Sequence, residues 1–586
     1  MKDFFKFTLA SVLGIVLACI IFTIIGIVSL VGMVASSDTE TNVQENSILY
    51  LNLEGLLSER VENNPLQDLM GEKFTSYGLD DILSSIQKAK DNENIKGIYL
   101  QPSAFIAEYP SLEEIRKALS DFKENGKFIV AYSDQYTQAM YYLASVADKI
   151  IVNPQGSIAL HGLVSQTMFY TDLMKKVGIE MQIFKVGTYK AAVEPFIATE
   201  MSDANREQIS VYLNSIWERI LEDISESRNV SIEKLNQYAD NMMDFKMAEE
   251  YVACGLADTL MYKDEVLSYL KTMTGREKDE SLRTLSVEDM KNVKRNTPLD
   301  KSGNIIAVYY AFGEIGATIP SNEGINPDKV INDLRKIRED ESIKALVFRV
   351  NSPGGSAYGS EQIWREIALM KEKKPVIVSM GDYAASGGYY ISCAADYIVA
   401  NPTTLTGSIG IFGMFPNFDG LLNNKFGLHF DIVKTNKFAD FCSMNRPFNG
   451  GEKEIMQNYI NNGYELFVKR CADGRGMSTE AIKKIAEGRV WTGAAAKELG
   501  LVDELGGLDK ALEIAVQKAG VESYSVINFP SQGNSILSLL DKTKEDYIQG
   551  QISSTMGEYR DYIKFIQNIK DMDHIQARMP FTLNIH

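Results

Sequence analysis

The sequence predicts an α/β fold that is present twice in tandem and is preceded by a membrane anchor. Three observations predict it: a repeat at an offset of 248 residues, alternating strand and helix patterns in each copy, and a long apolar N-terminal stretch. The chain of 586 residues also exceeds the size of one ordinary domain.

The repeat is clearest in the motif LDDILSSIQKAKDNENIK, which starts at Leu79 and returns as PDKVINDLRKIREDESIK from Pro327. The same offset aligns Tyr141-Tyr142 with Tyr389-Tyr390. A constant register over separated motifs indicates a duplicated domain.

Each copy alternates short apolar runs with longer amphipathic stretches. The runs predict buried strands and the stretches predict helices, which together indicate parallel strands joined by crossover helices. In the first copy the expected strands are Ile48–Leu53, Ile98–Leu100, Phe128–Tyr132 and Ile150–Val152, and the clearest helix is Ser111–Phe122.

These patterns divide the chain into five segments. We expect an anchor at 1–45, a first repeat at 46–274, a polar linker at 275–303, a second repeat at 304–530 and a helical tail at 531–586. Amphipathic character between Lys544 and Lys570 predicts the helix of the tail, as a packing or oligomer-contact element.

The N-terminal stretch has no charged residue between Lys6 and Asp38, and residues 7–35 are almost wholly apolar. About 20 such residues suffice to cross a bilayer, whereas a cleaved signal has a shorter apolar region. An uncleaved single-pass anchor is therefore expected, and cleavage near Ala35 is the alternative. Lys2 and Lys6 place the N-terminus in the cytoplasm and the rest on the periplasmic side of the cytoplasmic (inner) membrane.

The net charge and the cysteine spacing indicate which classes of partner and cofactor to expect. A net charge of -18 argues against a nucleic-acid binder, which needs a basic face. No pair of the five cysteines has the spacing of a metal or redox motif, and a disulfide among the four outside the anchor stays open. We expect these four to be buried, and we expect no metal and no cofactor.

The two copies differ at a serine. In the second copy Ser386 lies in MGDYAASGGYYIS, flanked by small residues, whereas the first copy has Gln138 there. A serine entering a helix suits a nucleophile whose neighbouring amide stabilises an oxyanion, and a helix N-cap is the structural alternative.

The reverse difference occurs at a lysine. The first copy has Lys190 in KVGTYKAAVEPF, and Ala439 lies opposite it in the second copy. A solvated surface charge is the ordinary role of a lysine, but this reciprocal loss singles out Lys190. We expect Glu194, shortly after it, to be a surface carboxylate.

A third difference is the turn Asn351–Gly355 (NSPGG), which replaces Ser103–Ala107 of the first copy. Glycines let backbone amides approach a ligand closely, although an ordinary tight turn has the same composition.

These motifs, together with LTGSIGIFG, resemble the long form of signal peptide peptidase, or protease IV, a family of ClpP/crotonase-like folds. The resemblance extends from Met1 to Phe529. It implies a serine–lysine dyad shared between the repeats, with Ser386 as nucleophile, Lys190 as general base and Ser408 orienting the lysine. It also implies an oxyanion hole from the amides of Gly355 and Gly387, a homotetramer, and signal-peptide remnants and other apolar peptides as substrates.

Ser408 has a counterpart, Ser157, in the first copy, so a turn hydroxyl would also explain it. Asp382 likewise matches Asp134, which favours a structural role for both.

The sequence fits two other functions and a histidine-based mechanism less well. A crotonase-type acyl-CoA enzyme would need neither Ser386 nor Lys190, and an inactive membrane scaffold would not keep them. A Ser-His-Asp triad is disfavoured because none of the four histidines has a matched carboxylate context: His161, His429, His574 and His586.

Overall fold

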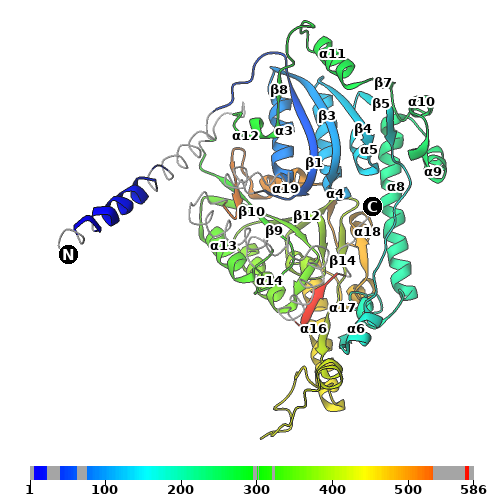
Figure 1. Ribbon diagram of the computed structural model, residues 1–586. Helices are drawn as coiled ribbons and strands as arrows, with labels where there is room; N and C mark the ends of the chain where they lie inside the picture. The colour runs from blue at the N-terminus through cyan, green and yellow to red at the C-terminus, as the bar shows by residue number, and fades with distance from the viewer. Residues whose placement is uncertain are drawn as a thin grey trace.

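A computed structural model describes most of the chain. The described residues are 6–8, 10–22, 25, 40–61, 76–294, 300, 302–319, 324–531 and 574–579. Two lobes lie against each other, the first repeat in blue through cyan to green and the second in green through yellow to orange (Figure 1).

The first repeat is built on a parallel sheet in the order β2-β1-β3-β4-β5-β7, with β8 also pairing with β1. Its strands are β1 (Ser47–Ser58), β2 (Ser76–Gly78), β3 (Ile95–Ile106), β4 (Phe128–Tyr136), β5 (Lys149–Ile158), β7 (Thr259–Leu260) and β8 (Thr284–Leu285). Its helices are α3 (Leu79–Asp91), α4 (Tyr109–Glu124), α5 (Gln138–Ala144), α6 (Thr171–Val177), α7 (Glu194–Ile197), α8 (Asp203–Arg228), α9 (Ile232–Asp240), α10 (Ala248–Ala253), α11 (Lys263–Met273) and α12 (Val287–Lys291).

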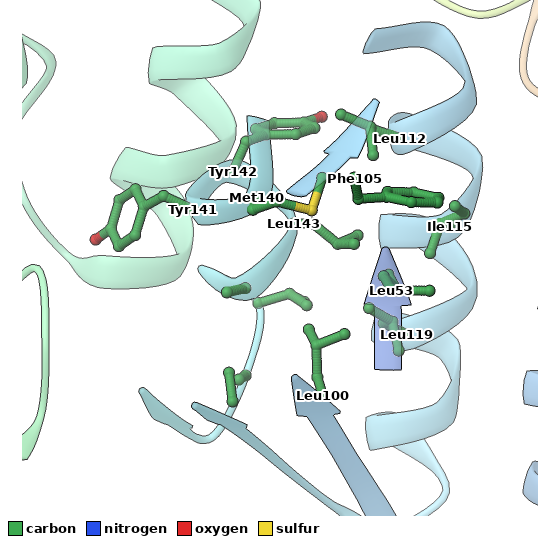
Figure 2. Packing of buried hydrophobic residues seen from close by; sticks show 14 of the residues in the cluster. Leu53, Leu100, Phe105, Leu112, Ile115, Leu119, Met140, Tyr141, Tyr142 and Leu143 are labelled. Carbon is green, nitrogen blue, oxygen red and sulfur yellow. The ribbon is translucent and has the colours of Figure 1, made fainter. Parts of the chain in front are cut away.

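The core of this repeat lies between the sheet and its helices. Figure 2 shows Leu53 and Leu100 of the sheet packing toward Leu119 of α4, with Met140 and Leu143 of α5 beside them. All five side chains are fully buried, which explains why strand runs and helix stripes alternate in the sequence.

The second repeat has a similar sheet in the order β16-β14-β12-β10-β9-β18, with β13 also pairing with β12. Its strands are parallel except for β16, which pairs antiparallel with β14. Its strands are β9 (Ile305–Phe312), β10 (Ile343–Ser352), β12 (Val376–Ala385), β13 (Tyr397–Ala400), β14 (Leu405–Gly407), β16 (Val490–Thr492), β17 (Glu504–Leu505) and β18 (Ser525–Phe529). Its helices are α13 (Pro327–Glu339), α14 (Ala357–Lys371), α15 (Gly387–Ser392), α16 (Gly450–Arg475), α17 (Thr479–Ile485), α18 (Gly493–Glu498) and α19 (Leu508–Ala519).

A third, antiparallel sheet joins segments far apart in the sequence, in the order β11-β19-β15-β6. Its strands are β6 (Glu180–Lys185), β11 (Gly354–Ser356), β15 (Phe412–Asn417) and β19 (Ile575–Arg578). Because β6 belongs to the first repeat and β15 to the second, this pairing carries the chain before Lys190 into the second repeat.

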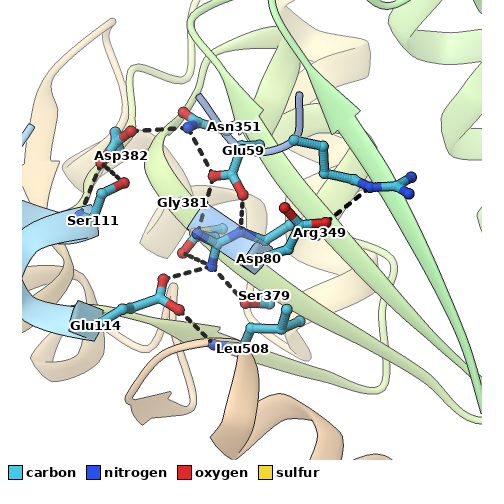
Figure 3. A network of polar contacts seen from close by, with 12 residues as sticks. Glu59, Asp80, Ser111, Glu114, Arg349, Asn351, Ser379, Gly381, Asp382 and Leu508 are labelled. Atoms are coloured by element: carbon cyan, nitrogen blue, oxygen red, sulfur yellow. Dashed lines mark hydrogen bonds and ion pairs between the residues drawn. The ribbon is translucent and has the colours of Figure 1, made fainter. Parts of the chain in front are cut away.

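A buried polar network also joins the repeats (Figure 3). Arg349 on β10 is 1% exposed and contacts Glu59 of the first repeat through Nε and Nη2, at 2.9 and 3.0 Å. Its Nη1 lies 2.8 Å from Glu114 Oε1. Burial alone would lower the pKa of the Arg349 guanidinium, but Glu114 and Glu59 raise it above its ordinary value. Arg349 therefore stays charged between the lobes.

The same network includes Asp382, which accepts hydrogen bonds from the Ser111 amide and hydroxyl at 3.0 and 2.7 Å. Asn351 Nδ2 donates both to Asp382 and to Glu59, at 2.9 Å each. These contacts give Asp382 the structural role predicted for it, as a link between the repeats.

The predicted α/β duplication is confirmed, and each predicted strand and helix of the first copy lies inside an observed one. The segment expected as a linker differs: β8 pairs with β1, and Met290 and Val287 of α12 are buried in the first core. Val287 and Met290 lie three residues apart on one face of α12, so the expected linker packs as part of the first repeat.

The described end of the tail contains the strand β19, which the sequence did not predict. The amphipathic stretch 544–570 lies outside the described residues. Of the predicted anchor, residues 10–22 are helical and 26–35 lie outside the described residues. No helix within the described ranges is both long and apolar enough to cross a membrane.

Replacing Arg349 tests the interface. Arg349→Met leaves two buried carboxylates without their cation, so the free energy of unfolding should fall by about 3–5 kcal/mol. Arg365→Met removes an exposed arginine from α14 and serves as the matched control. Urea unfolding followed by circular dichroism measures both variants, and equal stabilities would show that the network contributes nothing.

Candidate active site

Ser386 lies at the turn between a strand and a helix. β12 ends at Ala385 and α15 begins at Gly387, and Ser386 between them has φ of 54°, which is rare for a residue with a side chain. Its hydroxyl makes no capping bond to α15, so the N-cap alternative does not explain it. The side chain is fully buried, and strain at a buried serine is typical of functional sites.

Lys190 of the first repeat reaches this serine. Its Nζ lies 2.7 Å from Ser386 Oγ, 3.1 Å from Ser408 Oγ and 3.0 Å from the Ser408 carbonyl oxygen. The structure thus brings together three of the residues singled out in the sequence, from both repeats.

Burial governs the charge of this lysine. Lys190 is 0% exposed, and desolvation lowers the pKa of its amine well below the ordinary value. A neutral amine has a lone pair that can accept a proton. An ordinary surface lysine is protonated at neutral pH and has no such lone pair. The surface alternative for Lys190 is therefore wrong.

The backbone of Lys190 is held by a segment of the second repeat. Tyr189 N–H donates to the Glu487 carbonyl at 3.0 Å. A Cβ on Gly488 would lie 2.7 Å from Lys190 N, Cα and Cβ, so only glycine permits this approach. Gly488 is not among the residues predicted from the sequence. In the register that aligns Gly255 with Gly500, it falls opposite Met243, so the same comparison of copies would have found it.

Ser408 lies in a second strained turn, with φ of 48°, and its N–H donates to the Arg489 carbonyl at 2.7 Å. Ser386 N–H donates to the carbonyl of Gly407, next to it, at 2.8 Å. This turn therefore positions both the serine and the lysine. Ser408 is fully buried, whereas its counterpart Ser157 is half-buried, so matching residues have different environments in the two copies.

The glycine turn at Gly354 and Gly355 lies close to the amide that follows Ser386. Gly354 and Gly355 have φ of 101° and 150°, and a Cβ on Gly355 would lie 2.2 Å from the Ile315 carbonyl oxygen. A Cβ on Gly354 would lie 2.7 Å from Gly387 N. The turn therefore requires glycine, and it brings the Gly355 strand against the amide that follows Ser386.

Glu194 is not the surface carboxylate expected. It is 5% exposed and accepts hydrogen bonds from Ser202 Oγ and from Asn205 Nδ2, the latter at 2.9 Å. It ties the segment after Lys190 to the start of α8, a contact between separate elements that no sequence pattern indicates.

The histidines lie elsewhere in the described structure. His161 Nδ1 is 3.1 Å from Asp244 Oδ2, and the His574 ring packs on Phe415. The described partners of the Ser386 hydroxyl are Lys190 and the Gly410 carbonyl. His586 lies outside the described residues.

All five cysteines are free. Cys393 and Cys471 are buried as expected, whereas Cys254 is half-buried and Cys442 is exposed. Within the described part of the chain, no group of three or more His, Cys, Asp or Glu side chains could hold a metal ion.

Two α/β repeats that bury a serine hydroxyl against a lysine amine define the class of the protein: a duplicated α/β protein with a candidate nucleophilic serine at the boundary between its repeats. Comparison with known proteins narrows the class. The model of peptidase family S49 matches residues 121–276 and 368–522, once in each repeat.

Three known proteases align with this chain over most of their own length. The chain is 39% identical to Protease 4 of Salmonella typhi, over 81% of this chain and 79% of that protein. It is 34% identical to Protease 4 of Haemophilus influenzae, over 91% and 89%. It is 32% identical to the chloroplastic serine protease SPPA of Arabidopsis thaliana, over 92% and 78%. The chain belongs to peptidase family S49 and is a serine peptidase of the protease IV type.

Titration of Lys190 provides a test independent of activity. Because its pKa is lowered in the folded state, the unfolded chain binds more protons between that pKa and about 10.4, the value of a free lysine. The stability of the wild type should therefore rise with pH in this window, by up to about 1.4 kcal/mol per pH unit relative to Lys190→Met.

Urea unfolding of both proteins at several pH values between 8 and 10 measures the difference, and Lys185→Met is the control for removing a nearby lysine. Parallel stability curves for wild type and Lys190→Met would mean that Lys190 is charged in the folded chain.

Proposed function

We propose that the chain is a membrane-anchored endopeptidase in which Ser386 is the nucleophile and Lys190 the general base. The observation that carries this is the 2.7 Å approach of Lys190 Nζ to Ser386 Oγ inside a fully buried site. A neutral amine at this distance can take the hydroxyl proton as the serine attacks.

The reaction then runs in two halves. Ser386 Oγ bonds to the carbonyl carbon of the substrate, and the amides of Gly355 and Gly387 stabilise the oxyanion. Lys190, now an ammonium, returns its proton to the nitrogen of the leaving peptide, and an acyl-enzyme remains. A water molecule, deprotonated by Lys190, breaks the ester and restores Ser386.

Ser408 orients the base. Its hydroxyl and carbonyl oxygens both lie within 3.1 Å of Lys190 Nζ, on atoms fixed by a strained turn. They direct the lone pair of the amine toward Ser386, because a neutral amine can donate its two hydrogens to these oxygens.

The proposed substrates are signal-peptide remnants and other apolar peptides. An apolar stretch at residues 7–35 would hold the peptidase at the bilayer in which such peptides lie, with the two repeats on the periplasmic side of the cytoplasmic membrane. The resemblance to signal peptide peptidases supports the same class of substrate.

We also propose a homotetramer. Apolar side chains on a projecting loop of the second repeat support contact with other copies: Phe426, Leu428, Phe430, Ile432 and Val433 are 43–98% exposed. Light scattering of the detergent-extracted protein gives the number of copies, and a monomer would overturn this assembly.

The competing functions have less support. The chemistry of a crotonase-type acyl-CoA enzyme would not require the lysine that is buried against Ser386. An inactive scaffold leaves unexplained a buried amine whose desolvation destabilises the fold.

Removing either member of the dyad should abolish hydrolysis. Ser386→Ala and Lys190→Ala should each lower kcat/KM for an apolar peptide ester by at least about a thousandfold. Ser157→Ala, the first-copy counterpart of Ser408, should leave the rate unchanged. A fluorophosphonate probe should label Ser386 in the wild type but not in Lys190→Ala. Hydrolysis that survives both substitutions would contradict the mechanism.

Deleting the apolar stretch tests the anchor. A chain without residues 1–39 should move from the membrane pellet to the supernatant after alkaline carbonate washing, because about 20 apolar residues hold the wild type in the bilayer. It should keep its activity on soluble ester substrates. A deleted chain that stays in the pellet would mean that another part of the protein binds the membrane.

A further inference from the structure

A row of polar side chains on α8 faces the segment that carries Lys190. Ser202 caps the helix, and Asn205 and Gln208 follow at spacings of three residues, which places all three on one face. Asn205 and Gln208 are 1% and 2% exposed, and a helix face buried to this degree is ordinarily apolar. Because α8 runs from the first lobe alongside the second (Figure 1), this polar face lies at the boundary between the repeats.

The side-chain amide of Gln208 joins the backbones of the two repeats. Its Nε2 donates to the Tyr189 carbonyl at 3.1 Å, and its Oε1 accepts from Val490 N–H at 3.2 Å. Tyr189 immediately precedes Lys190, whereas Val490 lies on β16, which pairs with β14 directly before Ser408. One amide therefore links the backbone next to the proposed base to the strand pair that leads into Ser408.

The same amide belongs to a longer row of hydrogen bonds. Gln208 Nε2 also donates to Asn205 Oδ1 at 2.9 Å, and Asn205 Nδ2 donates to Glu194 Oε2 at 2.9 Å. Glu194 follows Lys190 along the chain and accepts a further hydrogen bond from Ser202 Oγ. The row therefore holds the chain on both sides of Lys190.

A comparison of the two copies connects Gln208 with the lysine. The helices α8 and α16 are counterparts, since each has 26 residues and follows a polar cap, Ser202 in one and Asn449 in the other. In this register Ile455 stands where the first copy has Gln208, and it is 46% exposed. A buried amide in the copy with Lys190 thus corresponds to an exposed apolar side chain in the copy without it. A requirement of the helix alone would apply to both copies.

We propose that Gln208 is a positioning residue for Lys190. Its side-chain amide fixes the backbone at Tyr189 against β16, and this holds the lysine amine beside Ser386 and away from water. The inference rests on the proposed function, because it takes Lys190 as the base of the reaction.

The position of this segment determines the pKa of the amine. Burial is the cause that lowers the pKa of Lys190. The charged side chains on the elements around the segment have partners of their own: Glu194, Glu207, Glu487 and Arg489. If the segment loosens, water reaches the amine, and its pKa rises toward about 10.4, the value of a free lysine.

The pH dependence of hydrolysis separates positioning from folding. Gln208→Met keeps the approximate size of the side chain but removes its hydrogen bonds. Because the rising limb of kcat/KM against pH reports the pKa of the base, this limb should move to higher pH by about one unit. The rate should be about tenfold lower than that of the wild type below the limb and should approach the wild-type rate above it. A fluorogenic apolar peptide amide measured between about pH 6 and pH 10 gives both curves.

Gln138→Met is the matched control. Gln138 is also a buried glutamine whose amide binds backbone groups, those of His161 and Gly162. Its replacement should change the rate by one factor at every pH. Asn205→Ala is a milder second variant, because it breaks the row but leaves both backbone bonds of Gln208, and its limb should move in the same direction by a smaller amount.

Urea unfolding at several pH values gives a readout without activity. The stability of the wild type should rise with pH above the lowered pKa of Lys190, and in Gln208→Met this rise should begin at higher pH.

The outcomes separate the two proposals. Limbs and stability curves that stay in place in both variants, or a rate lowered by one factor at every pH, would overturn the positioning role. Hydrolysis that survives Ser386→Ala would instead contradict the proposed function, and the stability curves would still decide the role of Gln208.

Discussion

The burial of the Lys190 amine against Ser386 is the constraint on which the rest of the structure depends. A lysine loses several kcal/mol of hydration when it is buried as a cation, so the fold must either pair it with a carboxylate or keep it neutral. Its closest partners are hydroxyl and carbonyl oxygens of Ser386 and Ser408, and desolvation lowers its pKa. The folded chain therefore favours the neutral amine over the ammonium at this position.

The lysine comes from outside the repeat that carries the serine, and the contacts between the two copies position it there. The β6–β15 pairing brings the chain before Lys190 onto the second repeat, and the close approach of Gly488 fixes the backbone of Lys190. The Arg349 network locks the two lobes at a separate point. Each repeat keeps its own parallel sheet and core, so the chemistry lies at the boundary without disturbing either fold.

Much of this was predictable because the chain contains its own comparison. Ser386 and Lys190 stood out since each is missing from the other copy, and apolar periodicity located the strands and helices of the first sheet. Contacts between distant segments were not predictable. The burial of Glu194 depends on Ser202 and Asn205, and the short motif at Ile575–Arg578 has no pattern that marks it as a strand in the third sheet.

The central claim is that Lys190 and Ser386 of the same chain form one site. Co-expression of Ser386→Ala with Lys190→Ala, carrying different affinity tags, tests it most directly, with mixed oligomers purified on both tags. Because each chain then lacks one member of its own pair, the mixture should hydrolyse peptide esters no faster than either variant alone. Recovery of a substantial fraction of the wild-type rate would mean that the pair forms between neighbouring chains, and would contradict the account.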